Sequence, residues 1–183
     1  MRTPRLLLAV VMVLAALPAV AEGPAPSHPG YVDGSMFRKL VDENDEITEV
    51  DLDEAMLKAL GKKKREDEPG ERELFANLVA VHAVIGKVKG PASNAMALVQ
   101  QTDQKLDSMG WRRITRIKDE TTSLSVLTHV SGEQIDGLVV LIFDAEDREI
   151  VFANLAGQID LDKLGAIGER FDVPGLEHIP GAH

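Results

Sequence analysis

Two histidines, His82 and His129, are the residues whose type best suits metal chemistry inside a folded domain. The other three histidines of the chain lie near its ends, at His28, His178 and His183. Two imidazoles and a carboxylate could hold a zinc ion, but only if the two segments that carry the histidines are neighbours. Both lie in predicted strands and no HExxH spacing is present, so an ordinary strand histidine is the alternative interpretation of each.

Carboxylates are the second group that could bind or catalyse. Two acidic runs, Asp42–Glu46 and Asp144–Glu149, offer oxygens for calcium but lack the D-x-[DN]-x-[DN]-G pattern, and we interpret them as solvated turns. Two D-L-D pairs, Asp51–Asp53 and Asp160–Asp162, each follow a predicted strand and begin a predicted helix. Paired carboxylates in a cleft would suit a glycosidase, whereas helix capping explains both pairs without a cleft.

Three arginines, Arg112, Arg113 and Arg116, follow Trp111 and could hold an anionic ligand, or form the wet face of a half-exposed strand. Serine-hydrolase, phosphate-loop and dinucleotide motifs are missing from the sequence. The chain has no cysteine, which excludes disulfides, thiolate zinc sites and cysteine nucleophiles. The sequence therefore favours a non-catalytic protein, and no cofactor is expected.

The first 21 residues have the pattern of an export signal. A start with two arginines precedes the apolar run Leu6–Leu17, and Ala19–Ala21 supplies a small-x-small cleavage site. The run is shorter than the ~20 residues that cross a bilayer. We expect cleavage near Ala21-Glu22 and a periplasmic or secreted protein without a stable membrane span or lipid anchor.

The charge of the chain indicates which partners to expect. It has 30 acidic and 20 basic residues, a formal net charge of −10. Nucleic acid and anionic lipid surfaces are disfavoured partners for such a chain.

Hydrophobic periodicity predicts helices and strands along most of the chain. The predicted helices are Ser35–Val41, a helix that begins at Asp51 or Asp53 and ends at Gly61, Pro91–Met109 and Asp160–Phe171. The predicted strands are Ile47–Leu52, Leu78–Val88, Trp111–Lys118, Thr121–Val130, Asp136–Asp144 and Glu149–Ala156. The apolar face of the most regular helix consists of Ala95, Leu98, Val99, Thr102, Leu106 and Met109.

The four strands between Trp111 and Gly157 are joined by short polar turns and predict an antiparallel meander. A bare sheet does not stabilise a domain, so helices Pro91–Met109 and Asp160–Phe171 should cover one face. The predicted fold class is α+β, a two-layer sandwich of a mainly antiparallel sheet with helices packed on one face. Because Leu138–Phe143 is apolar on both faces, the second face also needs cover, by a second copy or another protein.

The predicted organisation is a signal peptide (1–21), a flexible tether (22–34), one α+β domain (35–171) and a tail (172–183). The open face of the sheet is the predicted binding surface, with Trp111, Arg113, Leu138, Val140, Ile142 and Phe152 as candidate binding residues.

Several segments together resemble the small exported bacterial proteins of domain-of-unknown-function family 4252 (DUF4252). The resembling segments are GYVD (Gly30–Asp33), Val50–Leu60, Gly110–Asp119, Leu138–Leu164 and FDVPGLE (Phe171–Glu177). Many members resemble lipoproteins with a cysteine at the cleavage site, where this chain has Ala21-Glu22. The resemblance implies the fold and export, and it brings no catalytic residues.

We therefore expect an exported, non-catalytic binding or assembly module of the bacterial cell envelope, which binds an envelope protein or a second copy through the sheet face. Two alternatives stay open. One is a metal-binding protein or metal-dependent hydrolase that uses His82 and His129. The other is a carrier of a small apolar ligand between sheet and helices.

Overall fold

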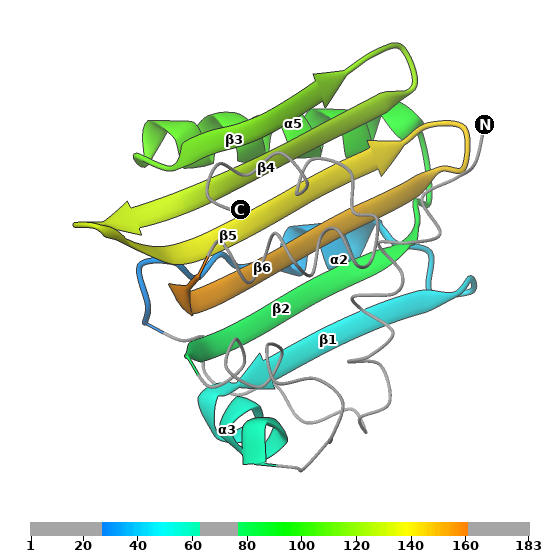
Figure 1. Cartoon of the computed structure of the whole chain (residues 1–183). Helices are drawn as coiled ribbons and strands as arrows, with labels where there is room; N and C mark the ends of the chain where they lie inside the picture. The colour runs from blue at the N-terminus through cyan, green and yellow to red at the C-terminus, as the bar shows by residue number, and fades with distance from the viewer. Residues whose placement is uncertain (1–26, 63–76, 161–183) are drawn as a thin grey trace.

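The computed structural model describes residues 27–62 and 77–160, which form one six-stranded sheet flanked by helices (Figure 1). The strands are β1 (Ile47–Asp53), β2 (Leu78–Lys87), β3 (Arg112–Lys118), β4 (Thr122–Ser131), β5 (Gln134–Asp144) and β6 (Glu149–Ile159). The helices are α2 (Ser35–Leu40), α3 (Glu54–Lys62) and α5 (Ala92–Ser108). The predicted α+β class is confirmed, while the predicted signal peptide, the C-terminal tail and, beyond Asp160, the last helix lie outside the described residues.

The order of the strands is β1-β2-β6-β5-β4-β3, and every neighbouring pair is antiparallel. The last four strands form the predicted meander. β6 also pairs with β2, so that Phe152 lies opposite Leu141 on one side and Val84 on the other. The two halves of the chain are thereby joined in one sheet, with β1 and β3 at its two edges (Figure 1).

The turn between β5 and β6 is tied to the end of β2. Arg148 in this turn has a φ of 55°, in the left-handed region that non-glycine residues rarely adopt. Its guanidinium donates a hydrogen bond to the carbonyl oxygen of Val88 at 2.9 Å, and the backbone N–H of Val88 donates to the carbonyl oxygen of Arg148 at 2.8 Å. These contacts stabilise a conformation that the backbone alone would disfavour.

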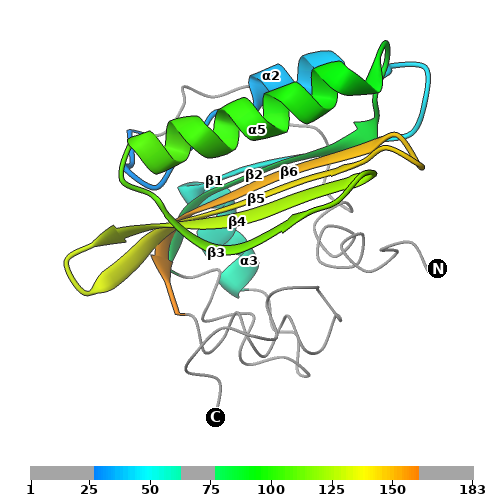
Figure 2. The same cartoon turned by 90° about the horizontal axis from the view of Figure 1, so that it is seen from above.

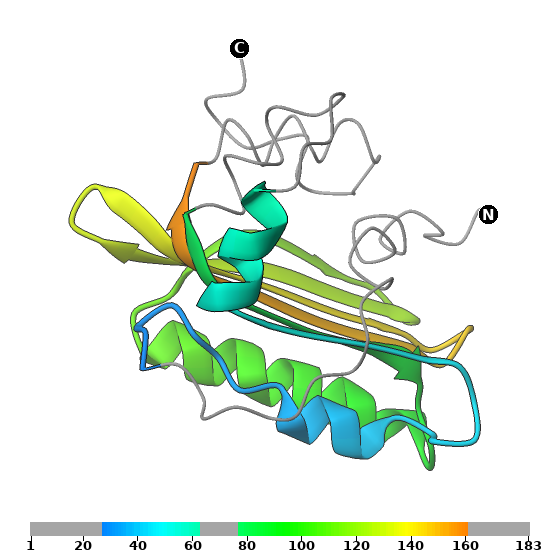
Figure 3. The ribbon, with the colours of Figure 1, turned by 90° about the horizontal axis from the view of Figure 1, so that it is seen from below.

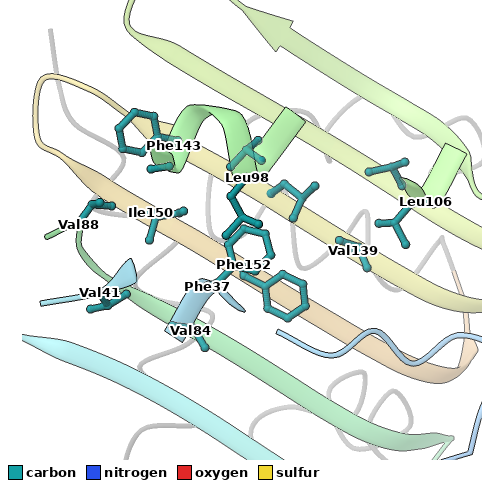
Figure 4. Packing of buried hydrophobic residues seen from close by; sticks show 14 of the residues in the cluster. Phe37, Val41, Val84, Val88, Leu98, Leu106, Val139, Phe143, Ile150 and Phe152 are labelled. Carbon is teal, nitrogen blue, oxygen red and sulfur yellow. The ribbon is translucent and has the colours of Figure 1, made fainter. Parts of the chain in front are cut away.

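Helices α5 and α2 cover one face of the sheet, as Figure 2 shows. The layer between them and the sheet is filled by apolar side chains, and the ring of Phe37 stacks on that of Phe152 with centroids 4.7 Å apart (Figure 4). The buried residues of α5 are Ala95, Leu98, Val99, Asp103 and Leu106. The predicted stripe was wrong at Met109, which is 60% exposed, because the helix ends at Ser108 and the stripe with it.

Helix α3 lies on the opposite face, over β1 and β2 (Figure 3). Asp53 caps this helix, since its Oδ1 accepts the backbone N–H of Met56 at 2.8 Å, which decides between the two predicted caps. Leu57 is fully buried in the same apolar cluster as Leu52 and Val81. The face that the sequence analysis left open thus carries a helix and a second apolar core.

Within the described part of the chain, no helix is long and apolar enough to cross a membrane.

Candidate functional site

The segment His28–Gly34 crosses the face of the sheet that α5 and α2 cover, over β5, β6 and β2. Gly30 lies so close to β5 that a Cβ atom there would fall 1.8 Å from the carbonyl oxygen of Asp136. Only glycine allows this approach. The sequence analysis assigned residues 22–34 to a flexible tether, whereas residues 28–34 are packed against the sheet. Their glycines serve close packing rather than flexibility.

Asn154 on β6 holds this segment in place. Its side chain is fully buried, and its Oδ1 accepts the backbone N–H of Val32 at 2.9 Å. Its Nδ2 donates to the carbonyl oxygens of Gly30 at 2.9 Å and Leu138 at 3.1 Å. The amide therefore has its acceptor and both donor directions satisfied in the core. The sequence analysis missed this role, although an asparagine inside an apolar strand was a usable signal.

His82 on β2 lies opposite Asn154 in the sheet register, beneath the same segment. It is 8% exposed, and neither ring nitrogen has a hydrogen-bond partner among the described residues. The nearest carboxylate oxygen is Oδ1 of Asp51, 4.0 Å from Nδ1. The ring also contacts Phe152, with centroids 5.7 Å apart. His82 is thus a buried imidazole whose polar atoms are not satisfied.

Asp51, the carboxylate nearest to His82, also acts on Tyr31 of the segment His28–Gly34. Burial raises the pKa of the Tyr31 hydroxyl, and the carboxylates of Asp51 and Asp33 raise it further. The phenol of Tyr31 therefore stays neutral at physiological pH.

His129 on β4 is paired with Asp136 on β5, with Nδ1 and Oδ1 2.5 Å apart. Asp136 is 8% exposed, and the His129 ring lies 5.4 Å from the ring of Trp111. A carboxylate that orients an imidazole can support general-base catalysis when a nucleophile contacts the other ring nitrogen. The His129 ring contacts Asp136 and Trp111, and we interpret the pair as structural.

The two histidines do not share a site. β6 and β5 lie between the strands that carry them, which amounts to three strand spacings, or roughly 14 Å. Metal–nitrogen bonds are about 2 Å long, so both imidazoles cannot bind one ion. No group of three or more potential metal ligands occurs within residues 27–62 and 77–160.

Arg113 of the predicted basic group is already paired. Its Nε and Nη2 donate to the two carboxylate oxygens of Asp103 at 3.0 and 2.8 Å, and Ser125 Oγ donates to Asp103 at 2.7 Å. Burial acts to raise the pKa of Asp103, but the hydrogen bonds from Arg113 and Ser125 outweigh it and hold the pKa below its ordinary value. These three residues join α5 to the strands β3 and β4.

The predicted sheet-face residues do not form one surface. Leu138, Val140 and Ile142 belong to the apolar core on the α3 side of the sheet. Trp111 and Phe152 belong to the core beneath α5 and α2. All five are buried. Alternation along β5 correctly put Leu138, Val140 and Ile142 on one face. The face on which Phe152 of β6 lies depends on the register between the strands, which the sequence does not show.

The two acidic runs form turns. Asp42 accepts hydrogen bonds from the backbone and side-chain nitrogens of Asn44, both at 3.0 Å, and these bonds hold its pKa below the ordinary value. Asp144 Oδ1 accepts the backbone N–H groups of Glu146 at 2.8 Å and Asp147 at 3.2 Å. Both carboxylates thus stabilise the turns in which they lie.

The two strand histidines, His82 and His129, should respond to the same substitution with opposite signs. We expect His82→Leu to raise the free energy of unfolding by about 1 kcal/mol, because it removes two unsatisfied buried nitrogens. His129→Leu should lower it by about 2 kcal/mol, because Asp136 loses its partner while staying buried. Urea denaturation of both variants and the unsubstituted protein measures the difference. If both variants lose stability equally, the contrast between the two environments is wrong.

The structure defines this protein as an α+β protein whose single antiparallel sheet carries helices on both faces. The family model described as "Domain of unknown function (DUF4252)" matches residues 37–167, and the chain belongs to this family. The match excludes the Gly30–Asp33 segment and includes all six strands. No curated protein and no solved structure matches the chain.

Proposed function

We propose that this protein is an exported, non-catalytic binding or assembly module of the bacterial cell envelope. The observation that supports binding is that both edges of the described sheet are open. Each of β1 and β3 has a strand neighbour on one side only, among the described strands. An edge strand offers unpaired backbone groups to which an extended segment of a partner can add.

The side chains at these edges are accessible. On β3, Arg112, Arg116 and Lys118 are exposed, and Ile117 is 42% exposed. On β1, the exposed side chains are those of Glu49, Asp51 and Asp53. The buried faces of the sheet offer no comparable surface, so we place the binding function at the edges rather than at the predicted sheet face.

The geometry argues against the two alternatives. A metal site shared by His82 and His129 would need neighbouring strands, and β6 and β5 lie between them. A carrier for an apolar ligand would need space beneath α5 and α2. That layer is filled by buried side chains such as Phe37, Phe143 and Phe152.

Export is tested by the mass and location of the natural product. The protein expressed with its leader in a Gram-negative bacterium should appear in the periplasmic extract, with an intact mass that corresponds to a chain beginning at Glu22. A full-length product that stays in the cytoplasm would contradict export.

Binding at an edge is tested by site-specific photocrosslinking in the same cells. A crosslinker at Ile117 on the β3 edge should give a covalent adduct with a protein. A crosslinker at Met36, which is 58% exposed on the outer side of α2, serves as the control and should not. Equal adducts at both positions, or none at Ile117, would contradict the proposal.

A further inference from the structure

We infer that copies of this chain associate head to tail, with β3 of one copy added to β1 of the next. This inference rests on the proposed function, because it names a second copy as the partner at the edges. Its support comes from strand direction, from charge and from one exposed apolar side chain.

Strand direction allows the addition without turning a copy over. Five antiparallel pairings separate β1 from β3, so the two edge strands run in opposite directions. A second copy displaced across the sheet therefore brings its β1 antiparallel to β3 of the first. The faces covered by α5 and α2 then lie on the same side in both copies, and the sheet continues with its usual twist.

The β1 edge is acidic on the face that α5 and α2 cover. Glu49, Asp51 and Asp53 alternate with Val50 and Leu52, which belong to the core on the other face. The Arg38 side chain of α2 reaches Glu49 with an Nε–Oε2 distance of 2.9 Å, which confirms the side on which the carboxylates lie.

The β3 edge is basic on the same face. Across β4, the side chains of Arg113, Arg116 and Lys118 lie opposite Leu127, Ser125 and Ser123, respectively. Leu127 belongs to the core beneath α5. The irregularity between Arg113 and Thr115 adds one residue to β3. Arg113 and Arg116 are therefore on the same face although they are three residues apart, and Lys118 follows two residues later on that face.

An antiparallel junction pairs these two rows. With Glu49 opposite Lys118, Asp51 comes opposite Arg116 and Asp53 comes beside Arg113. Opposite charges directly across a strand pair stabilise it, and like charges destabilise it. Pairing of β3 with β3, or of β1 with β1, would oppose like charges, so complementarity selects the head-to-tail junction.

Arg116 and Lys118 are available for this role. Neither takes part in an ion pair within the described residues, whereas Arg113 is held by Asp103. In the same register Ile117 lies opposite Val50, on the α3 side of the sheet. The junction would thus cover the one exposed large apolar side chain of β3.

Sedimentation equilibrium of the purified protein measures the association. We expect the weight-average mass to rise with protein concentration to twice the monomer mass or more, because a head-to-tail contact does not close on itself after two copies. The mass should fall toward the monomer in 1 M salt, where the screening length is only about 3 Å. A mass that stays monomeric at every concentration would overturn the inference.

Two charge-reversal variants test the junction itself. Arg116→Glu/Lys118→Glu makes both edges acidic, and Glu49→Lys/Asp51→Lys makes both edges basic. Each variant alone should stay monomeric. An equimolar mixture should associate again, because every edge then meets an opposite one. The matched control, Lys39→Glu/Lys105→Glu, reverses two exposed helix charges and should associate like the unsubstituted protein.

Two outcomes of the charge-reversal experiment would contradict the inference. Association by either reversed variant alone, or a mixture that stays monomeric while both variants show native circular dichroism, would overturn the inference. If a reversed variant does not fold, Arg116→Gln/Lys118→Gln replaces it and should weaken association at least tenfold. Unchanged association would overturn the inference.

Crosslinking at Ile117 separates the inference from the proposed function. If Ile117 crosslinks to a different protein and never to a second copy, the edge binds but the inference is wrong. If Ile117 crosslinks to nothing, the proposed function fails as well.

Discussion

Replacing Arg113 with methionine is expected to lower the free energy of unfolding by about 3 kcal/mol. Asp103 is 2% exposed and receives two hydrogen bonds from Arg113. Methionine keeps the apolar stem of the side chain and removes the charge, so the carboxylate stays buried with Ser125 as its remaining side-chain partner. Urea denaturation followed by circular dichroism measures the loss.

Arg116→Met is the matched control, since Arg116 lies on the same strand, is exposed and takes part in no ion pair within the described residues. It should change stability by less than about 0.5 kcal/mol. Adding Asp103→Leu to Arg113→Met should restore much of the lost stability, because no buried charge is then left alone. Equal effects of Arg113→Met and Arg116→Met would contradict this account.

The effect of Arg113→Met should depend on pH. The pKa of Asp103 in the folded protein lies below its ordinary value of 3.8. The stability that comes from the ionised carboxylate is therefore present above the ordinary pKa and is lost as the pH falls through the folded pKa. The difference in stability between Arg113→Met and the unsubstituted protein should accordingly shrink below about pH 4.

Asn154→Asp is expected to lower the free energy of unfolding by about 2–4 kcal/mol. The change keeps the shape of the side chain and the acceptor for Val32, but it replaces the donor to Gly30 and Leu138 with a carboxylate oxygen. Two buried carbonyl oxygens then face an acceptor. Besides global stability, hydrogen exchange at the amide of Val32 should become faster, because the segment His28–Gly34 loses its attachment.

Gln158→Glu is the control on the same strand, since Gln158 is exposed and makes one side-chain hydrogen bond, to Gln134 at 3.2 Å. It should cost less than about 0.5 kcal/mol and leave exchange at Val32 unchanged. A stable Asn154→Asp variant with slow exchange at Val32 would mean that this segment is held by other contacts.

Local pattern was sufficient to predict the strands and helices of the described residues. The alternation in Thr121–Val130 and the 3–4 spacing in Pro91–Met109 depend only on neighbouring residues, and β4 and α5 occupy these segments within a few positions. The place of β6 between β5 and β2 has no such signal. Pairing between strands far apart in the chain depends on which apolar faces meet, and several orders satisfy the same alternation.

The buried polar residues show where sequence reasoning stopped. Asp103 follows Val99 by four residues and precedes Leu106 by three, so it occupies a position of the apolar stripe. The sequence analysis put Thr102 in the stripe and missed Asp103, which is buried. The partners of Asp103, Arg113 and Ser125, become its neighbours only after the sheet forms. His82 and His129 were correctly placed on strands, yet their separation follows from strand order, which the sequence does not show.

The central position of β6 has a consequence for how the chain folds. β2 can complete its pairing only with β6, the last of the described strands, after α5 and three further strands have been made. The meander closes short loops and can form early, whereas the β2–β6 contact closes a long one. If the chain is exported unfolded, β1 and β2 emerge well before their neighbour, with apolar side chains on both faces. In that case, the pair of β1 and β2 must be shielded by a chaperone or remain unfolded until β6 has crossed the membrane.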